Sequence, residues 1–92
     1  MGGGVLTNGY FARSNFQGTN LREADFRGTR LFDANFTGSS LVNANLEGAS
    51  LIRANLEGAD LRFANLSNAL FINIIYDEAT QWPEGFTPPP SL

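Results

Sequence analysis

The stretch from residue 14 to residue 71 decides the fold, because it is built from groups of five. Residues 14–28 read Ser-Asn-Phe-Gln-Gly, Thr-Asn-Leu-Arg-Glu, Ala-Asp-Phe-Arg-Gly, and the arrangement continues without a slip. The central position of each five is Leu or Phe, and the residue two places before it is Ala, Ser or Thr. We expect the central residues to form the core: Phe16, Leu21, Phe26, Leu31, Phe36, Leu41, Leu46, Leu51, Leu56, Leu61, Leu66 and Phe71.

A period of five excludes both common regular structures. On an α-helix, a step of five residues rotates the side chain by about 500°, which would spread the Leu/Phe set around the whole cylinder. On a flat strand, side chains alternate between faces, so an odd step would send successive Leu/Phe residues to opposite sides. The pattern instead predicts an extended trio with its first and third side chains inward, followed by a two-residue corner.

The fives resemble those of the pentapeptide repeat proteins, whose consensus is Ala-(Asp/Asn)-Leu-X-X, over about residues 4–75. The resemblance implies an all-β fold, a right-handed quadrilateral β-helix with four fives in each coil. We expect the chain to divide into a flexible N-terminus (1–4), the β-helix (5–75), and a C-terminal cap with a Pro-rich tail (76–92). The segment after residue 75 is similar to the tail of cyanobacterial members.

Two details follow if four fives make a coil. Asn15, Asn35 and Asn55 would stack in one column, and we expect such columns to form amide ladders. Glycine ends every other five, as at Gly38, whereas the alternate corners carry larger residues such as Asp33. Because a type II turn needs a positive φ at its second central residue, we expect type II turns at the glycine corners and a different turn at the others.

Composition bounds the function. The 92 residues make one domain, with no apolar run long enough to cross a membrane or to act as a secretory signal, so the sequence predicts a cytoplasmic protein. Six Arg balance six acids within the coil, and the net charge of −3 comes from Asp77, Glu78 and Glu84. A neutral coil without Lys argues against nucleic-acid binding.

The residues for catalysis are missing. The chain has no His and no Cys, so the common metal ligands and the usual general base are absent. A narrow interior filled with Leu, Phe and Ala leaves no pocket for a small-molecule substrate. We therefore expect no enzyme activity, no cofactor and no metal.

The best candidate for function is an interaction surface. Phe32, Ile52 and Ile72 follow the inward residues of one side, with Leu70 beside them, and a contiguous apolar row often marks a protein contact. The alternative is that these residues reflect β-propensity or are covered by the protein's own tail. The sequence thus predicts a rigid scaffold that binds a protein partner or itself. The family resemblance offers a second function, a DNA mimic acting on a type II topoisomerase such as gyrase, although this coil is short and neutral.

The tail is predicted to close the coil. The last coil of a solenoid exposes its interior, and Tyr76, Trp82 and Phe86 are the large apolar residues available to cover it, although the segment could instead bind a partner. Charge is positive up to Arg30 and negative beyond it, which favours head-to-tail approach of two copies. We expect the segment 76–86 to prevent such stacking, and we expect residues 87–92 to be extended and loosely held.

Overall fold

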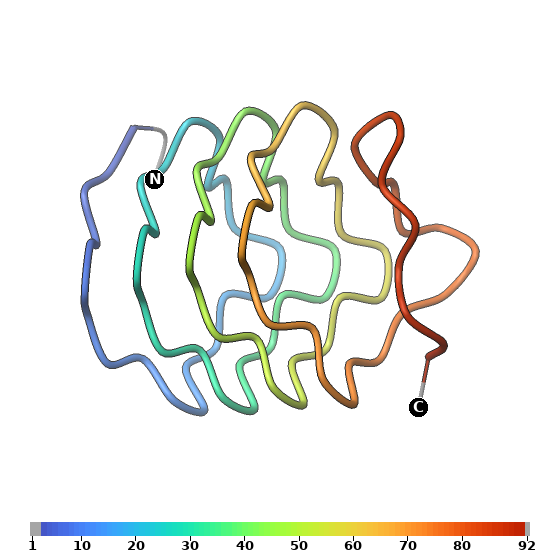
Figure 1. Cartoon of the computed structure of the whole chain (residues 1–92), viewed down its shortest axis with the longest axis horizontal. Coiled ribbons are helices and arrows are strands. Elements are labelled where there is room, and N and C mark those ends of the chain that lie inside the picture. Colours follow the sequence, from blue (N-terminus) through green and yellow to red (C-terminus); the bar gives the residue numbers. More distant parts are fainter. Residues whose placement is uncertain (1–2, 92) are drawn as a thin grey trace.

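The structure, a computed structural model, describes residues 3–91. Within this range the backbone contains no helix, and it is held together by isolated parallel β-bridges between successive coils. The bridges join Val5 to Asp25, Tyr10 to Arg30, Asn15 to Asn35, Asn20 to Ser40, Asp25 to Asn45, Arg30 to Ser50, Asn35 to Asn55, Ser40 to Asp60, Asn45 to Asn65, Ser50 to Leu70, Asn55 to Ile75 and Asp60 to Gln81. Each spans 20 residues except the last, which spans 21. Figure 1 shows the coils stacked along the longest axis.

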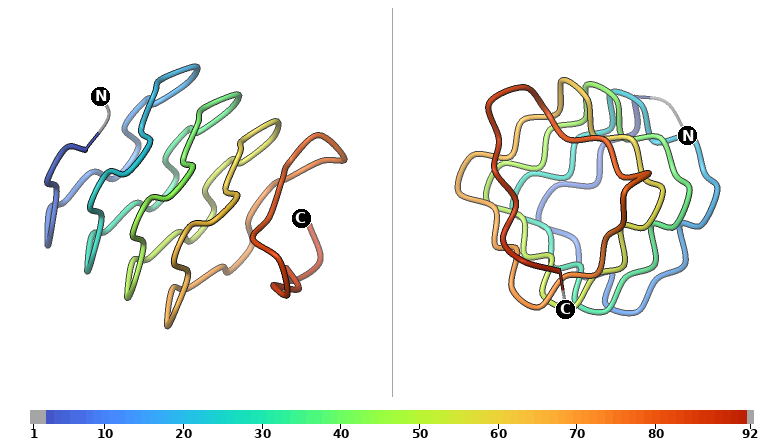
Figure 2. Two further views of the ribbon diagram at one scale, coloured as in Figure 1. Left: turned by 90° about the horizontal axis from the view of Figure 1, so that it is seen from above. Right: turned by 90° about the vertical axis from the view of Figure 1, so that its right-hand side faces the viewer.

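Four bridges in each turn of 20 residues give the coil four flanks. The right-hand view of Figure 2, along the longest axis, shows the coils as closed outlines stacked one behind another with a small offset. We call the flank built on Tyr10, Arg30, Ser50 and Leu70 the apolar flank. The flank two sides away, built on Asn20, Ser40 and Asp60, is the opposite flank.

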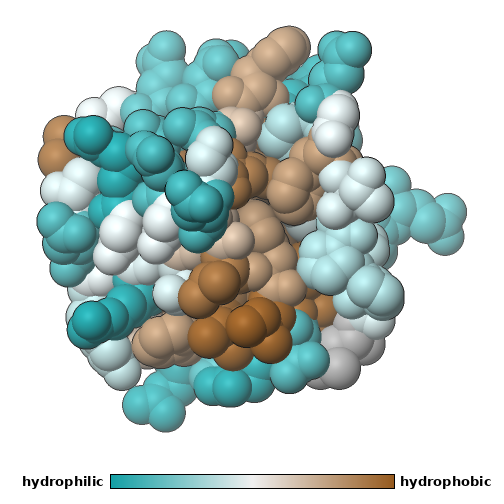
Figure 3. Space-filling model, in the orientation of Figure 1, coloured by the Kyte–Doolittle hydropathy of each residue, from teal (hydrophilic) through white to brown (hydrophobic). Residues whose placement is uncertain are grey.

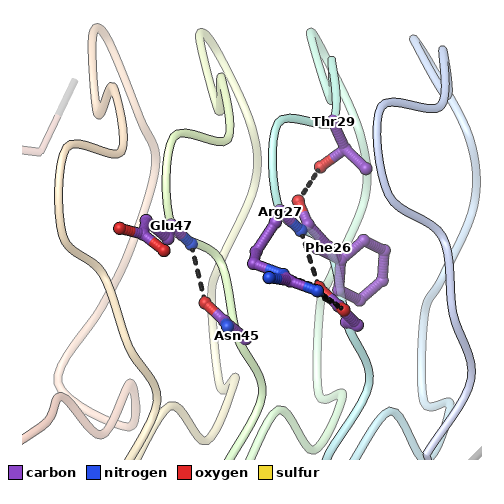
Figure 4. Close-up of polar contacts among 6 residues, drawn as sticks. Phe26, Arg27, Thr29, Asn45 and Glu47 are labelled. Carbon is purple, nitrogen blue, oxygen red and sulfur yellow. Dashed lines mark hydrogen bonds and ion pairs between the residues drawn. The ribbon is translucent and has the colours of Figure 1, made fainter.

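The interior is made of the repeated Leu/Phe and small residues. The Leu and Phe residues from Leu21 to Leu61 are at most 1% exposed, whereas Phe16, Leu66 and Phe71, near the two ends, are half-buried. Phe16 and Phe36 stack with ring centroids 5.0 Å apart and planes 8° apart, as the 20-residue spacing predicts. Inward hydroxyls donate to the Phe carbonyl of the preceding five, as from Thr29 Oγ1 to Phe26 at 2.7 Å, which Figure 4 shows.

The corners differ from the prediction. Glycines such as Gly38 have a φ near +66°, but the alternate corners are left-handed too, with a φ of 59° at Asp33 and 65° at Phe63. At both kinds of corner the small residue's N–H donates to the Leu/Phe carbonyl three residues earlier, as from Ala34 to Leu31 and from Ser39 to Phe36. Only the second central residue of each turn has positive φ, which is the signature of type II. The two-corner assignment is therefore wrong: every side must bend alike to close a four-sided coil, and non-glycine residues accept the strain.

The Asn and Asp residues also act differently from the predicted ladders. Their Oδ1 atoms accept a hydrogen bond from the backbone N–H two residues later, at 2.9–3.2 Å, instead of bonding to the Asn of the next coil. Figure 4 shows this bond between Asn45 and Glu47. The N–H at this position points outward at the bend, where the ladder cannot reach it, and an Asx turn supplies the missing acceptor.

The N-terminal segment joins the coil earlier than expected. Gly3 donates its N–H to the Arg22 carbonyl at 2.7 Å, and the Gly4 carbonyl accepts from Asp25 at 2.7 Å. Gly3 and Gly4 therefore belong to the ladder rather than to a flexible N-terminus. The next coil presents free backbone donors and acceptors at these positions, and the two glycines bond to them. Met1 and Gly2 lie outside the described residues.

The ladder also runs past residue 75, with one extra residue. Asp77 Oδ1 accepts the Gly58 N–H at 3.0 Å, where a backbone carbonyl of the next coil would otherwise stand, and the chain then bulges before Gln81 pairs with Asp60. Trp82 follows Gln81 as Leu61 follows Asp60, so it takes the place of the next inward Leu.

Aromatic rings gather at this end. Trp82 lies 6.0 Å from Phe71, 5.3 Å from Tyr76 and 5.3 Å from Phe86, measured between ring centroids. The Pro-rich segment is tied down, contrary to the expectation, because the Tyr76 hydroxyl donates to the Pro89 carbonyl at 2.6 Å and Ser91 Oγ accepts the Tyr76 N–H. The Tyr76 side chain thus packs its ring against Trp82 while its hydroxyl holds the Pro-rich segment. Leu92 lies outside the described residues.

Candidate interaction surface

The apolar flank is organised as two columns that run along the coil axis. One column contains Tyr10, Arg30, Ser50 and Leu70, which bridge one another in succession. The second contains Ala12, Phe32, Ile52 and Ile72, the first corner residues of the same side. The carbonyls of Phe32, Ile52 and Ile72 accept the N–H of the corner residue of the preceding coil at 2.7–2.9 Å. The ladder therefore holds the second column in register, one residue per coil.

The four residues predicted for the surface are all on this flank. Leu70 and Ile72 are 47% and 48% exposed, and Phe32 and Ile52 are half-buried. In Figure 3, hydrophobic side chains gather on the lower part of the face shown, and hydrophilic ones cover much of the rest. The described part of the tail leaves Leu70 and Ile72 exposed, so it does not act as their cover.

Tyr10 belongs to the same surface and was not singled out from the sequence. It is 69% exposed, and its ring meets that of Phe32 edge to face at 6.4 Å. The sequence could have identified Tyr10, because the 20-residue spacing places this residue in the same column as Leu70. Phe63, at 75% exposure the most exposed large aromatic of the described residues, lies at a corner away from this flank.

The backbone of the apolar flank is less sealed than that of the other flanks. None of its middle residues is Asn or Asp, so no Asx turn forms there. Accordingly, the N–H groups of Phe32, Ile52 and Ile72 make no hydrogen bond with any part of residues 3–91. A row of outward N–H groups beside apolar side chains is costly to bury unless an acceptor or water is supplied.

Three of the six Arg residues form ion pairs, and one of these pairs lies at a corner of the apolar flank. Arg53 Nε lies 2.8 Å from Asp33 Oδ1 at the neighbouring corner, and Arg27 pairs with Asp25 and Arg62 with Asp60 at 2.7 Å. Hydrogen bonds from the Arg side chain lower the pKa of each of these Asp residues. Arg30 is exposed on the flank itself and has no ion-pair partner among residues 3–91. Arg30 is thus a positive charge without an ion pair in a largely apolar setting, and Arg13 in the neighbouring corner column also forms no ion pair with residues 3–91.

The side-chain clusters and hollows of the described chain were compared with what a metal or substrate site needs. No group of three acidic, His or Cys side chains there could hold a metal ion, and no helix there could cross a membrane. An open hollow of about 350 Å³ lies between residues 64–67 and the tail at 83–86, and a second, of about 300 Å³, is lined by Thr7, Asn8, Arg27 and Gly28. Both are open to solvent, and each is lined by at most one carboxylate, so neither holds a pair of acids in a concavity.

Comparison with known proteins agrees with the fold. The chain matches the family model of pentapeptide repeats over residues 5–38 and 39–75. No curated protein matches its sequence.

Among solved structures it is similar to the pentapeptide repeat protein Rfr23 from the cyanobacterium Cyanothece 51142, with 31% identity, a TM-score of 0.63, and coverage of 85% of this chain and 63% of Rfr23. It is also similar to a pentapeptide repeat protein from the Arabidopsis thaliana thylakoid lumen, with 27% identity, a TM-score of 0.50, and coverage of 94% and 55%. The chain therefore spans less than two thirds of the length of each. The five-residue pattern, the four-sided coil and these matches together place the chain in the pentapeptide repeat family.

Proposed function

We propose that the protein is a non-catalytic scaffold that binds a protein partner through the apolar flank. The observation that carries this proposal is the row of unbonded N–H groups at Phe32, Ile52 and Ile72 beside exposed apolar side chains. A partner that covers the row would bury apolar area and could supply the missing acceptors. A right-handed coil and a cytoplasmic location complete the proposal, from the family resemblance and the sequence respectively.

The test is capture from native lysate with three immobilised proteins: wild type, Ile52→Asp and Gln17→Asp. Ile52→Asp places a charge in the apolar column. Gln17→Asp is the matched control, because it changes the same repeat position on a neighbouring flank where the N–H already bonds to Asn15. We expect proteins retained by wild type and Gln17→Asp but lost with Ile52→Asp. Retention of the same proteins by all three would contradict the proposal.

The second function from the sequence, a DNA mimic of a type II topoisomerase, has less support. The longest dimension is 28 Å, and three of the acids in the coil are paired with Arg, which removes the long acidic rod that such mimicry requires. Supercoiling by gyrase with and without added protein is the direct assay.

We further propose that the tail acts as a cap and stopper. The stack of Trp82 and Phe86 over Phe71, and the extra residue before Gln81, support this role because they interrupt the register that another coil would need. A chain shortened to end at Asn73 should form larger species, more so at low salt. If sedimentation shows it as monodisperse as the full chain, the stopper role is wrong.

A further inference from the structure

We compared the residues that would face one another if a second copy of the apolar flank were turned end to end and laid against the first. The flank contains four coils, so a two-fold axis between the second and third coils sets the first coil of one copy opposite the fourth of its partner. Tyr10 then faces a second Leu70, and Arg30 faces a second Ser50. In the other column Ala12 faces Ile72, and Phe32 faces Ile52. Apolar residues thus face apolar ones in three of these pairs, Arg30 faces a hydroxyl in the fourth, and no charge meets its like.

The neighbouring corner column supports the same arrangement. It reads Arg13, Asp33, Arg53, Asn73 along the axis. Reversal sets Asp33 of one copy opposite Arg53 of the other, and both side chains are about half exposed, with 40% and 54% of their side-chain surface accessible. The pair that already forms within each chain at 2.8 Å would extend to four alternating charges across the contact.

The same-direction arrangement has no such match. It sets the second coil of each copy against the other's second coil, so the unpaired Arg30 meets the coil that carries Arg30 in its partner. Two like charges held at the same level of an apolar contact are unfavourable. End-to-end stacking on the tail side is obstructed by the Trp82 and Phe86 rings.

We propose that the apolar flank binds a second copy of this chain in an antiparallel, two-fold arrangement. The proposal rests on the proposed function, since it names the occupant of the same surface. The body measures 28 × 24 × 21 Å, so one flank provides less than the roughly 800 Å² per partner of a standard interface. The open N–H groups of Phe32, Ile52 and Ile72 then face the same donors of the second copy, so water must stay between the two columns to accept their hydrogen bonds. The dimer is therefore weak and depends on concentration. Two-fold closure also limits the assembly to a pair.

A cysteine experiment tests the register. The chain has no Cys, and Tyr10 and Leu70 are 69% and 47% exposed, so Tyr10→Cys and Leu70→Cys introduce accessible thiols. Under mild oxidation at upper-micromolar concentration, we expect a covalent dimer when the two variants are mixed, and several-fold less with either alone. Equal cross-linking of either single variant with itself would overturn the antiparallel arrangement. Absence of cross-linking in the mixture would overturn it as well.

A charge experiment tests the same contact without cross-linking. Ser50→Glu sets a carboxylate opposite Arg30 twice in the dimer, so the dissociation constant from sedimentation equilibrium at low salt should fall roughly two- to thirtyfold. Ser40→Glu is the matched control, because Ser40 holds the same repeat position on the opposite flank, and it should leave the constant unchanged. A weaker dimer with Ser50→Glu would contradict the register.

The two proposals can fail separately. If wild type remains monomeric at every concentration, the second copy is not the occupant. If lysate proteins are then still lost with Ile52→Asp but kept with Gln17→Asp, the flank binds another protein and the proposed function stands.

Discussion

The apolar flank and the opposite flank are built from the same repeat, with the same kinds of inward residue and the same turn, yet they present different surfaces. On the opposite flank, Asp60 Oδ1 accepts the backbone N–H of Arg62, whereas the matching N–H of Ile52 is unbonded. Val42 lies between Arg22 and Arg62 in its column and is only 6% exposed. Ile72 has no such neighbour beyond it and is 48% exposed.

The difference shows that the outer residues can vary while the coil is unchanged. Long Arg stems can cover an apolar neighbour, and an Asn or Asp can seal the backbone. Where both devices are missing, as on the apolar flank, a surface remains that another protein can cover.

The largest expected effect tests whether the flanks share one core. Leu41 and Leu51 lie behind the opposite and apolar flanks, and neither is exposed. Leu41→Ala and Leu51→Ala should each lower the free energy of unfolding by about 2–5 kcal/mol, because each leaves a cavity in a packed interior. Urea denaturation measures both. A loss confined to one variant would show that the flanks differ inside as well as outside.

The second effect tests the corners. Gly38 and Asn43 have a φ of 66° and 62° on successive sides. Gly38→Val and Asn43→Val should each cost about 1–3 kcal/mol, because a β-branched residue is forced into left-handed backbone. Asn43→Gly should be nearly neutral by comparison. A neutral Asn43→Val would restore the distinction between two kinds of corner.

The third effect concerns acid. The Arg62 guanidinium beside Asp60 lowers the pKa of that carboxyl in the folded protein, so the pair stabilises the fold above the unfolded value of about 3.9. This stabilisation is lost as pH falls through the lowered pKa. Thermal unfolding between neutral pH and pH 3 should show a drop in stability that is smaller in Asp60→Asn. The same slope in both proteins would show that the pair on the opposite flank contributes nothing measurable.

The smallest expected effect comes from giving the apolar flank an Asx turn like those of the other flanks. Ser50→Asn gives the Ile52 N–H the acceptor that it lacks, and one net hydrogen bond is worth about 0.5–1.5 kcal/mol. The variant should therefore unfold at higher urea than wild type, while Asn45→Ala, which removes such an acceptor from Glu47, should unfold at lower urea. If Ser50→Asn gains nothing, water already satisfies the open N–H.

The sequence predicts the interior of the molecule well because the period is strict. A Leu or Phe at every fifth position allows only an inward column, and burial from Leu21 to Leu61 follows. Glycine at alternate corners was less informative, because residues such as Glu23 adopt the same positive φ of 61°. The Asn side chains accept hydrogen bonds from the backbone N–H two residues later. The 20-residue spacing between coils cannot predict such a local contact.

The strict period also identifies the apolar side chains of the candidate surface, but not its open backbone donors. Phe32, Ile52, Leu70 and Ile72 emerge from the repeat, but the open N–H groups become visible only when each backbone donor is followed to its partner. The extra residue before Gln81 occurs only once, so the repeat pattern in the sequence could not predict it.

The four-sided coil with 20 residues per turn has a consequence for how such chains can lengthen or shorten. Duplication of a full turn adds height and leaves every downstream side chain on its own flank. Gain of a single five would instead carry all that follows to the next flank, and gain of ten would set Ile72 on the flank of Arg62. The length of an insertion thus determines the flank on which all later residues lie. In this fold a binding face can therefore move to the other side of the molecule without one substitution.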